Sequence, residues 1–147
     1  MTTEAGKGKS PNFISNPLNQ AVVRNNWSGH WIWPEAVKAD RNAYAFFRRE
    51  FRSTREEKLT IHITANNFYW LYLDGKFIGR GPVRSFPEYY SFDTFELNVE
   101  PGNHCLAAMV HHVGESNATI VVGRPGFLAD VFACDVNLST GDGWKCI

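Results

Sequence analysis

The chain has 147 residues, of which 44% are hydrophobic, and this length and composition suit one domain with its own core. Fifteen basic and fifteen acidic residues give a net charge of zero, so the sequence lacks the overall attraction to nucleic acid or to an anionic membrane that a basic protein has. No apolar run reaches the roughly 18 residues that would span a bilayer, and we expect no nucleic-acid or membrane partner.

Residues 1–25 are rich in Gly, Ser, Asn and Pro and lack hydrophobic periodicity. They predict a flexible lead-in, followed by a β-sandwich domain over residues 26–147. The aromatic segment WSGHWIWP at 27–34 is expected to lie along the sandwich and to bury Trp31 or Trp33. The first clear strand is AYAFFRREF at 43–51.

Residues 59–82 contain the strongest strand signal. Apolar and polar residues alternate from Leu59 to Asn66, which predicts a half-buried strand. A second strand is expected over 68–73. Asp74-Gly75 then suits a type I′ turn, so the pattern predicts a β-hairpin that ends at Gly79.

The remainder of the chain reads as further short strands. Residues 80–91 contain two prolines and a glycine and predict a long loop. Residues 104–113 are mostly apolar on both alternating faces, which predicts a strand buried on both sides. Further strands are expected over 92–99, 119–122, 126–129 and 131–138. About eight strands separated by turn residues predict an all-β fold, an antiparallel jelly-roll β-sandwich.

Several segments, in order, resemble bacterial α-L-rhamnosidases and related glycoside hydrolases. The longest is YWLYLDGKFIGRGPVRSFPEYYSFDTFEL at 69–97, which is similar to the family pattern LYxDGxxxGxGPxRSxPxxxxxDxYxL. The others are WIWP at 31–34, FRREF at 47–51, HHVGES at 111–116, GRPGFLA at 123–129 and TGDGWK at 140–145. The resemblance implies a galactose-binding-like β-sandwich, a non-catalytic accessory domain that precedes a catalytic (α/α)6 barrel. That barrel and rhamnose-containing or other glycans are the implied partners.

The sequence supports a catalytic or metal-binding function less well than it supports an accessory domain. Glycosidases use two carboxylates that face one bond, and no spacing here brings two together, so we expect no enzyme activity from this chain. His111 and His112 are adjacent, which sends them to opposite faces of a strand. A cupin-like metalloenzyme is therefore a distant alternative, and no metal or cofactor is expected. The three cysteines have no CxxC spacing and favour reduced thiols and a cytoplasmic location, with Cys105 buried and Cys146 exposed.

The loop at 80–90 is the candidate contact surface, because Arg and Tyr serve both sugar binding and protein interfaces. The candidate contact residues for a ligand or a neighbouring domain are Arg80, Arg84, Glu88, Tyr89, Tyr90, His112 and Glu115. Phe68, Trp70 and Tyr72 form an aromatic stripe, for which packing under a loop is the favoured interpretation and sugar stacking on Trp70 the alternative. Two functions stay open: a module that binds glycan, and a purely structural brace against the barrel.

Overall fold

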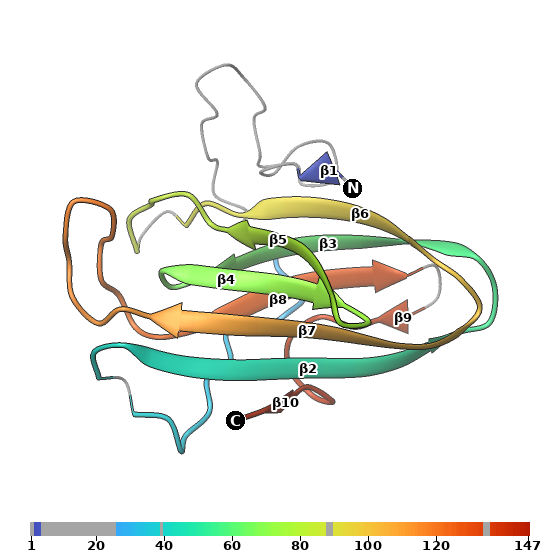
Figure 1. The fold of residues 1–147 in the computed structure, drawn as a ribbon, viewed down its shortest axis with the longest axis horizontal. Helices are drawn as coiled ribbons and strands as arrows, with labels where there is room; N and C mark the ends of the chain where they lie inside the picture. The colour runs from blue at the N-terminus through green and yellow to red at the C-terminus, as the bar shows by residue number, and fades with distance from the viewer. Residues whose placement is uncertain (1, 4–25, 39, 88–89, 134–135) are drawn as a thin grey trace.

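The computed structural model describes residues 2–3, 26–38, 40–87, 90–133 and 136–147, which form two facing antiparallel sheets (Figure 1). The first sheet has the order β1 (Thr2–Thr3), β6 (Asp93–Val99), β3 (Glu57–Ala65), β8 (Phe127–Ala133), β9 (Val136–Asn137). The second has the order β10 (Lys145–Cys146), β2 (Ala43–Ser53), β7 (Gly102–His112), β4 (Phe68–Leu73), β5 (Lys76–Gly81). The described part of the chain contains no helix, and therefore none that could cross a membrane.

The core lies between the two sheets, because alternate residues of each strand point inward. In Figure 1 the sheet of β2, β7, β4 and β5 lies in front of β3 and β8. Fully buried side chains from both sheets meet there, among them Phe47, Leu71 and Leu106 from one and Ile61, Phe95 and Val131 from the other. The predicted all-β sandwich is confirmed.

The predicted turn of the central hairpin is confirmed, and the hairpin is longer than predicted. Asp74 and Gly75 have φ values of 50° and 77°, as a type I′ turn requires. β5 continues to Gly81, two residues beyond the predicted end. A bulge between Leu71 and Tyr72 shifts the register of the β4–β5 pair.

The strand predicted as half-buried, β3, is buried on both faces over its second half. His62 and Thr64 are 2% and 1% exposed, although they alternate with the apolar core residues. Their polar atoms are paired, since His62 Nδ1 contacts Thr94 Oγ1 at 2.8 Å and Thr64 donates to the carbonyl of Ser91 at 2.6 Å. Phe92 packs edge-on against His62 and helps to cover this face.

Three other expectations are corrected or left open. Residues 119–122 form no strand; Asn117 and Ile120 instead close a turn through reciprocal backbone hydrogen bonds. Of the two tryptophans in the aromatic segment, Trp33 packs on the core while Trp31 is 45% exposed. Thr2–Thr3 pair with β6 as β1, and the rest of the predicted lead-in, residues 1 and 4–25, lies outside the described residues.

Candidate contact surfaces

The outer face of the β10-β2-β7-β4-β5 sheet carries rows of apolar side chains. Strand alternation sends every second residue outward, and the strand registers align these residues across the sheet. The first row is Tyr44, His111 and Phe68; the second is Phe46, Met109, Trp70 and Arg80; the third is Arg48, Ala107, Tyr72 and Phe77. We call these three rows the outer face. It corrects the expectation that residues 104–113 are buried on both sides, because Met109 and His111 are only half-buried.

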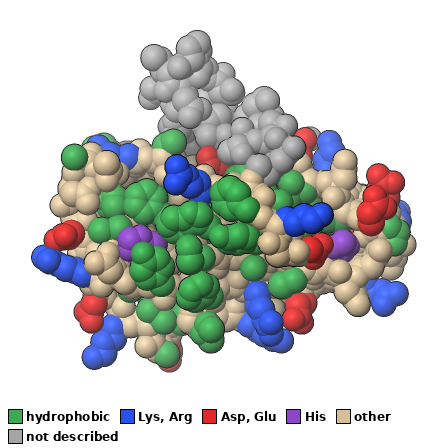
Figure 2. All heavy atoms as spheres, viewed as in Figure 1, with side chains coloured by type: hydrophobic (Ala, Val, Ile, Leu, Met, Phe, Trp, Pro, Cys, Tyr) green, Lys and Arg blue, Asp and Glu red, His purple; other side chains and the backbone are tan. Residues whose placement is uncertain are grey.

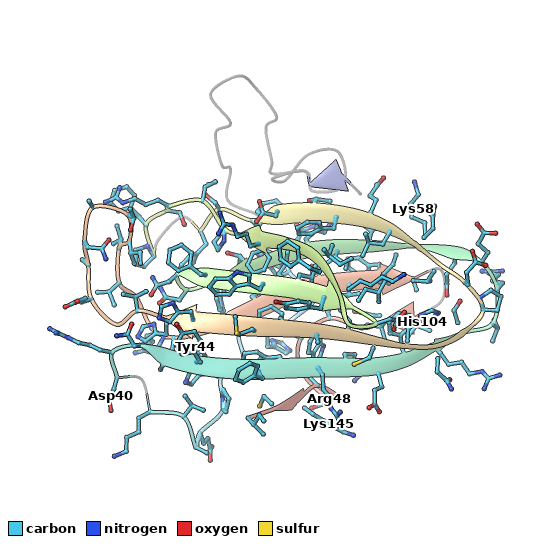
Figure 3. All side chains as sticks on the ribbon, in the orientation of Figure 1. Asp40, Tyr44, Arg48, Lys58, His104 and Lys145 are labelled. Atoms are coloured by element: carbon cyan, nitrogen blue, oxygen red, sulfur yellow. The ribbon has the colours of Figure 1, made fainter. Side chains whose placement is uncertain are left out.

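This face is unusually apolar for a surface. Tyr44, Phe46 and Phe77 are 45%, 50% and 57% exposed. Figure 2 shows hydrophobic side chains gathered over the middle of the sheet with charged ones around them, and Figure 3 shows Tyr44 and Arg48 projecting from β2 on this side. The Tyr44 and His111 rings stack with centroids 4.2 Å apart. A contiguous apolar patch of this kind marks an interaction site more often than a free surface.

One hollow on the outer face, the apolar groove, lies where β10 joins β2 and β7. It has a volume of about 590 Å³. Its side chains are apolar except at the margin; they are Phe46, Phe47, Arg48, Tyr72, Ala107, Ala108, Met109, Lys145, Cys146 and Ile147. Arg48 and Lys145 are its charged residues, and they face each other across β2 and β10. The groove is therefore apolar in its middle and basic at one side.

A second hollow, the aromatic recess, lies beside β4 and β5. It has a volume of about 430 Å³ and is lined by Phe68, Tyr69, Trp70, Arg80, Gly81, Pro82 and His111. Trp70 and Arg80 are direct cross-strand neighbours. Burial lowers the pKa of His111, so its ring is neutral near pH 7, and its Nε2 lies 3.2 Å from Asn42 Oδ1. The recess combines ring faces with one exposed guanidinium.

The loop at 80–90 contributes less than its composition predicts. Arg84 is exposed and its guanidinium carbon lies 5.5 Å from the Phe86 ring centroid. Tyr90 is held inward, because its hydroxyl accepts a 3.0 Å hydrogen bond from Asn66 and its ring packs on Trp31. The hollow beside Arg84 and Tyr90 has a volume of only about 20 Å³, room for one water and not for a sugar ring. Glu88 and Tyr89 lie outside the described residues.

His112 and Glu115, predicted to join that loop, are not brought to one surface. His112 is 2% exposed and its Nδ1 bonds Asn66 Oδ1 at 2.7 Å, so it belongs to the interior and not to a contact surface. Glu115 is exposed and pairs with Arg41 at 2.9 Å. Asn66 links His112 to Tyr90, a bridge that the sequence does not predict because it joins residues 24 and 46 positions apart.

The fold and sequence are similar to parts of larger proteins. The GH78 family rhamnosidase of Bacillus sp. GL1 is 33% identical, with a TM-score of 0.73 over 84% of this chain and 14% of that chain. The lectin of Pleurotus ostreatus, solved with GalNAc, is 22% identical, with a TM-score of 0.61 over 81% of this chain and 34% of that one. The α-L-rhamnosidase of Streptomyces avermitilis, solved with L-rhamnose, is 21% identical, with a TM-score of 0.59 over 92% of this chain and 14% of that one. No protein-family model and no curated protein matches the sequence.

Over most of its length, the chain matches one β-sandwich module of the GH78 rhamnosidases. It spans only 14% of the Bacillus rhamnosidase, so it corresponds to one small module of that protein. The predicted family resemblance is confirmed.

The glycines of the rhamnosidase-like GRGP sequence are required by close packing. A Cβ on Gly79 would lie 2.6 Å from Cε1 of Phe95 in the opposite sheet. A Cβ on Gly81 would overlap the carboxylate of Asp93, which accepts a hydrogen bond from the Tyr69 hydroxyl. Burial raises the pKa of Asp93 to about 6, although the Tyr69 hydrogen bond acts in the other direction. This part of the motif therefore joins the two sheets.

Other motif residues of the module are also structural. Asp74 accepts hydrogen bonds from the backbone N–H of Cys105 at 2.8 Å and from His104 at 2.7 Å, and the bond with Asp74 raises the pKa of His104. Buried Asp130 accepts bonds from the backbone of Ser28 and Gly29 at 2.7–3.1 Å and fixes the aromatic segment on β8.

The described part of the chain holds its buried carboxylates inside the sandwich and assembles no metal-binding cluster. Both strongly buried carboxylates, Asp93 and Asp130, are engaged inside the sandwich. His111 and His112 point to opposite faces of β7, as predicted. Within the described ranges, no three His, Cys, Asp or Glu side chains come close enough together to hold a metal ion.

Proposed function

We propose that the chain is a non-catalytic accessory module of an α-L-rhamnosidase-like glycoside hydrolase. It docks on another domain of that enzyme, the (α/α)6 barrel, through the apolar groove. The observation that carries this proposal is the groove itself, an open apolar hollow of about 590 Å³ around half-exposed Phe46. Protein interfaces are enriched in such aromatic and Met side chains at their centre and keep charges at the rim.

A folded domain fits the groove better than a glycan does. Sugar hydroxyls need both donors and acceptors, and the groove supplies few of them. Phe46 and Met109 are apolar, Arg48 and Lys145 only donate, and among the described lining residues only Tyr72 has a side-chain oxygen. Arg48 and Lys145 at the margin both lie near the Glu50 carboxylate, at 3.8 and 3.9 Å, so a partner meets a rim of mixed charge there. The 14% coverage of the Bacillus rhamnosidase supports a large neighbouring domain as the occupant.

The size of the outer face also supports docking within one enzyme. Three rows about 7 Å apart, on four strands about 4.8 Å apart, span a patch of roughly 14 by 14 Å between backbone positions. Such a patch is smaller than the roughly 800 Å² per partner that a stable complex between separate proteins buries. A covalent linker raises the effective concentration of the partner and makes so small an interface sufficient.

The test is association of this chain with a separately expressed rhamnosidase barrel from the same source. The variant Phe46→Asp places a charge in the groove and should weaken binding at least about tenfold. Val136→Asp is the matched control, because Val136 is 48% exposed on β9 of the other sheet, and Phe46 is 50% exposed. Equal binding by both variants contradicts docking through the groove, and so does the absence of any contact when the unmodified chain is joined to the barrel by a flexible linker.

A further inference from the structure

The aromatic recess differs from the apolar groove in its charge and its chemistry. Phe68, Trp70 and His111 supply ring surface, with the Phe68 and Trp70 centroids 6.3 Å apart. Arg80 brings a guanidinium to the same hollow from the neighbouring strand. No carboxylate is among the described residues that line it.

Arg80 is exposed, and its side chain forms no hydrogen bond or ion pair within the described part of the chain. Its five N–H donors are fixed in a plane that matches a carboxylate and can bind both of its oxygens. His111 is neutral near pH 7 because burial lowers its pKa, so Arg80 supplies the positive charge of the recess. An anionic group is therefore the complement that this hollow lacks.

The aromatic rings beside Arg80 restrict which kind of ligand can present the anionic group. Trp70 and Phe68 offer apolar faces, which pack on the C–H face of a pyranose ring. Arg80 lies directly across the strand pair from Trp70, so a ring on Trp70 places its exocyclic carbon within reach of the guanidinium. A volume of about 430 Å³ accommodates one or two sugar rings.

We propose that the aromatic recess binds a uronic acid residue of a glycan, with its ring on Trp70 and its carboxylate on Arg80. This inference rests on a different hollow and on different lining residues from docking through the apolar groove, although both hollows open on the outer face. It assigns the module a preference for acidic glycans.

The test uses matched pairs of simple glycosides that differ only at C6. Methyl β-D-glucuronide is compared with methyl β-D-glucoside, and methyl α-D-galacturonide with methyl α-D-galactoside, by NMR titration that follows the Trp70 indole and Arg80 Nε–H signals. At least one uronide should bind with a Kd of about 1 mM, the affinity expected of a ligand of this size. It should bind about tenfold tighter than its neutral partner, and salt should weaken only the uronide.

Substitutions test whether Arg80 causes the preference for the uronide. Arg80→Gln should abolish the preference for the uronide, and because this side chain is exposed the substitution should leave the fold intact. Arg52→Gln is the matched control, since Arg52 is exposed on the same face of β2 but about 20 Å along the strand from the second row. Phe46→Asp should leave uronide binding unchanged, which separates this site from docking. Equal binding of acid and neutral partners, binding of neither, or an unchanged preference in Arg80→Gln overturns the proposal.

Discussion

At the scale of single residues, the buried Asp93 is the most consequential polar group. It sits between the sheets with Tyr69 and below Gly81, and desolvation raises its pKa to about 6. In the unfolded chain an aspartate titrates near 3.9, so the folded state binds this proton more tightly. Because the pKa of Asp93 is higher in the folded state, its contribution to the free energy of unfolding is fully present below about pH 4. This contribution is lost as the pH rises through 6.

Asp93→Asn should remove this pH dependence. An amide keeps the shape of the protonated acid, and its oxygen can still accept from Tyr69. The variant should match the parent near pH 4 and exceed its free energy of unfolding by roughly 2 kcal/mol at pH 7.5, following 1.36 kcal/mol per pKa unit. Urea unfolding at both pH values measures the difference. A constant offset at both values would show that Asp93 is not the group that titrates.

At the scale of elements, β5 is shaped by the sheet behind it. The side chain of Phe95 on β6 fills the space in which a side chain at Gly79 would lie. The constraint on Gly75 in the hairpin turn is different. A Cβ there would meet no atom, but the residue has a φ of 77°, so glycine is favoured by the backbone conformation and not by close packing. Two glycines four residues apart therefore have different physical causes.

Gly79→Ala should destabilise the module by about 1–3 kcal/mol, because the added methyl forces Phe95 and the sheets apart. Gly75→Asn is the control: asparagine tolerates a positive φ and meets no atom there, so its cost should stay below about 1 kcal/mol. Thermal or urea unfolding of both variants measures the two costs. If Gly75→Asn is the more costly, close packing of the sheets is not what selects Gly79.

At the scale of the whole molecule, local patterns predicted more of the fold than of the contact surfaces. Alternation and the Asp74-Gly75 turn depend on neighbours in sequence, and they located β2, β4 and β7 within a few residues. The burial of His62 depends on Phe92, which is thirty residues away in the sequence. The alternation of apolar and polar residues within one strand does not predict that contact.

The same limit applies to the site. The stripe of Phe68, Trp70 and Tyr72 was predicted from β4 alone, with Trp70 as its stacking residue. Its continuation into Phe46 and Met109 depends on how β2 and β7 align, and a single strand does not encode that register. Composition favoured the loop at 80–90 because arginines and tyrosines cluster there. The described part of this loop borders a hollow of only about 20 Å³. Arg80 belongs instead to β5, on the outer face of the sheet.

The chain on its own should not hydrolyse rhamnosides. A glycosidase needs two carboxylates roughly 5 to 10 Å apart across one bond. Asp93 and Asp130 are buried and hydrogen-bonded in the sandwich, and Glu115 pairs with Arg41 at the surface. Incubation of the purified chain with p-nitrophenyl α-L-rhamnoside should release nitrophenol no faster than buffer does. Turnover that survives purification and is lost in Glu115→Gln or Glu88→Gln would overturn the assignment as an accessory module.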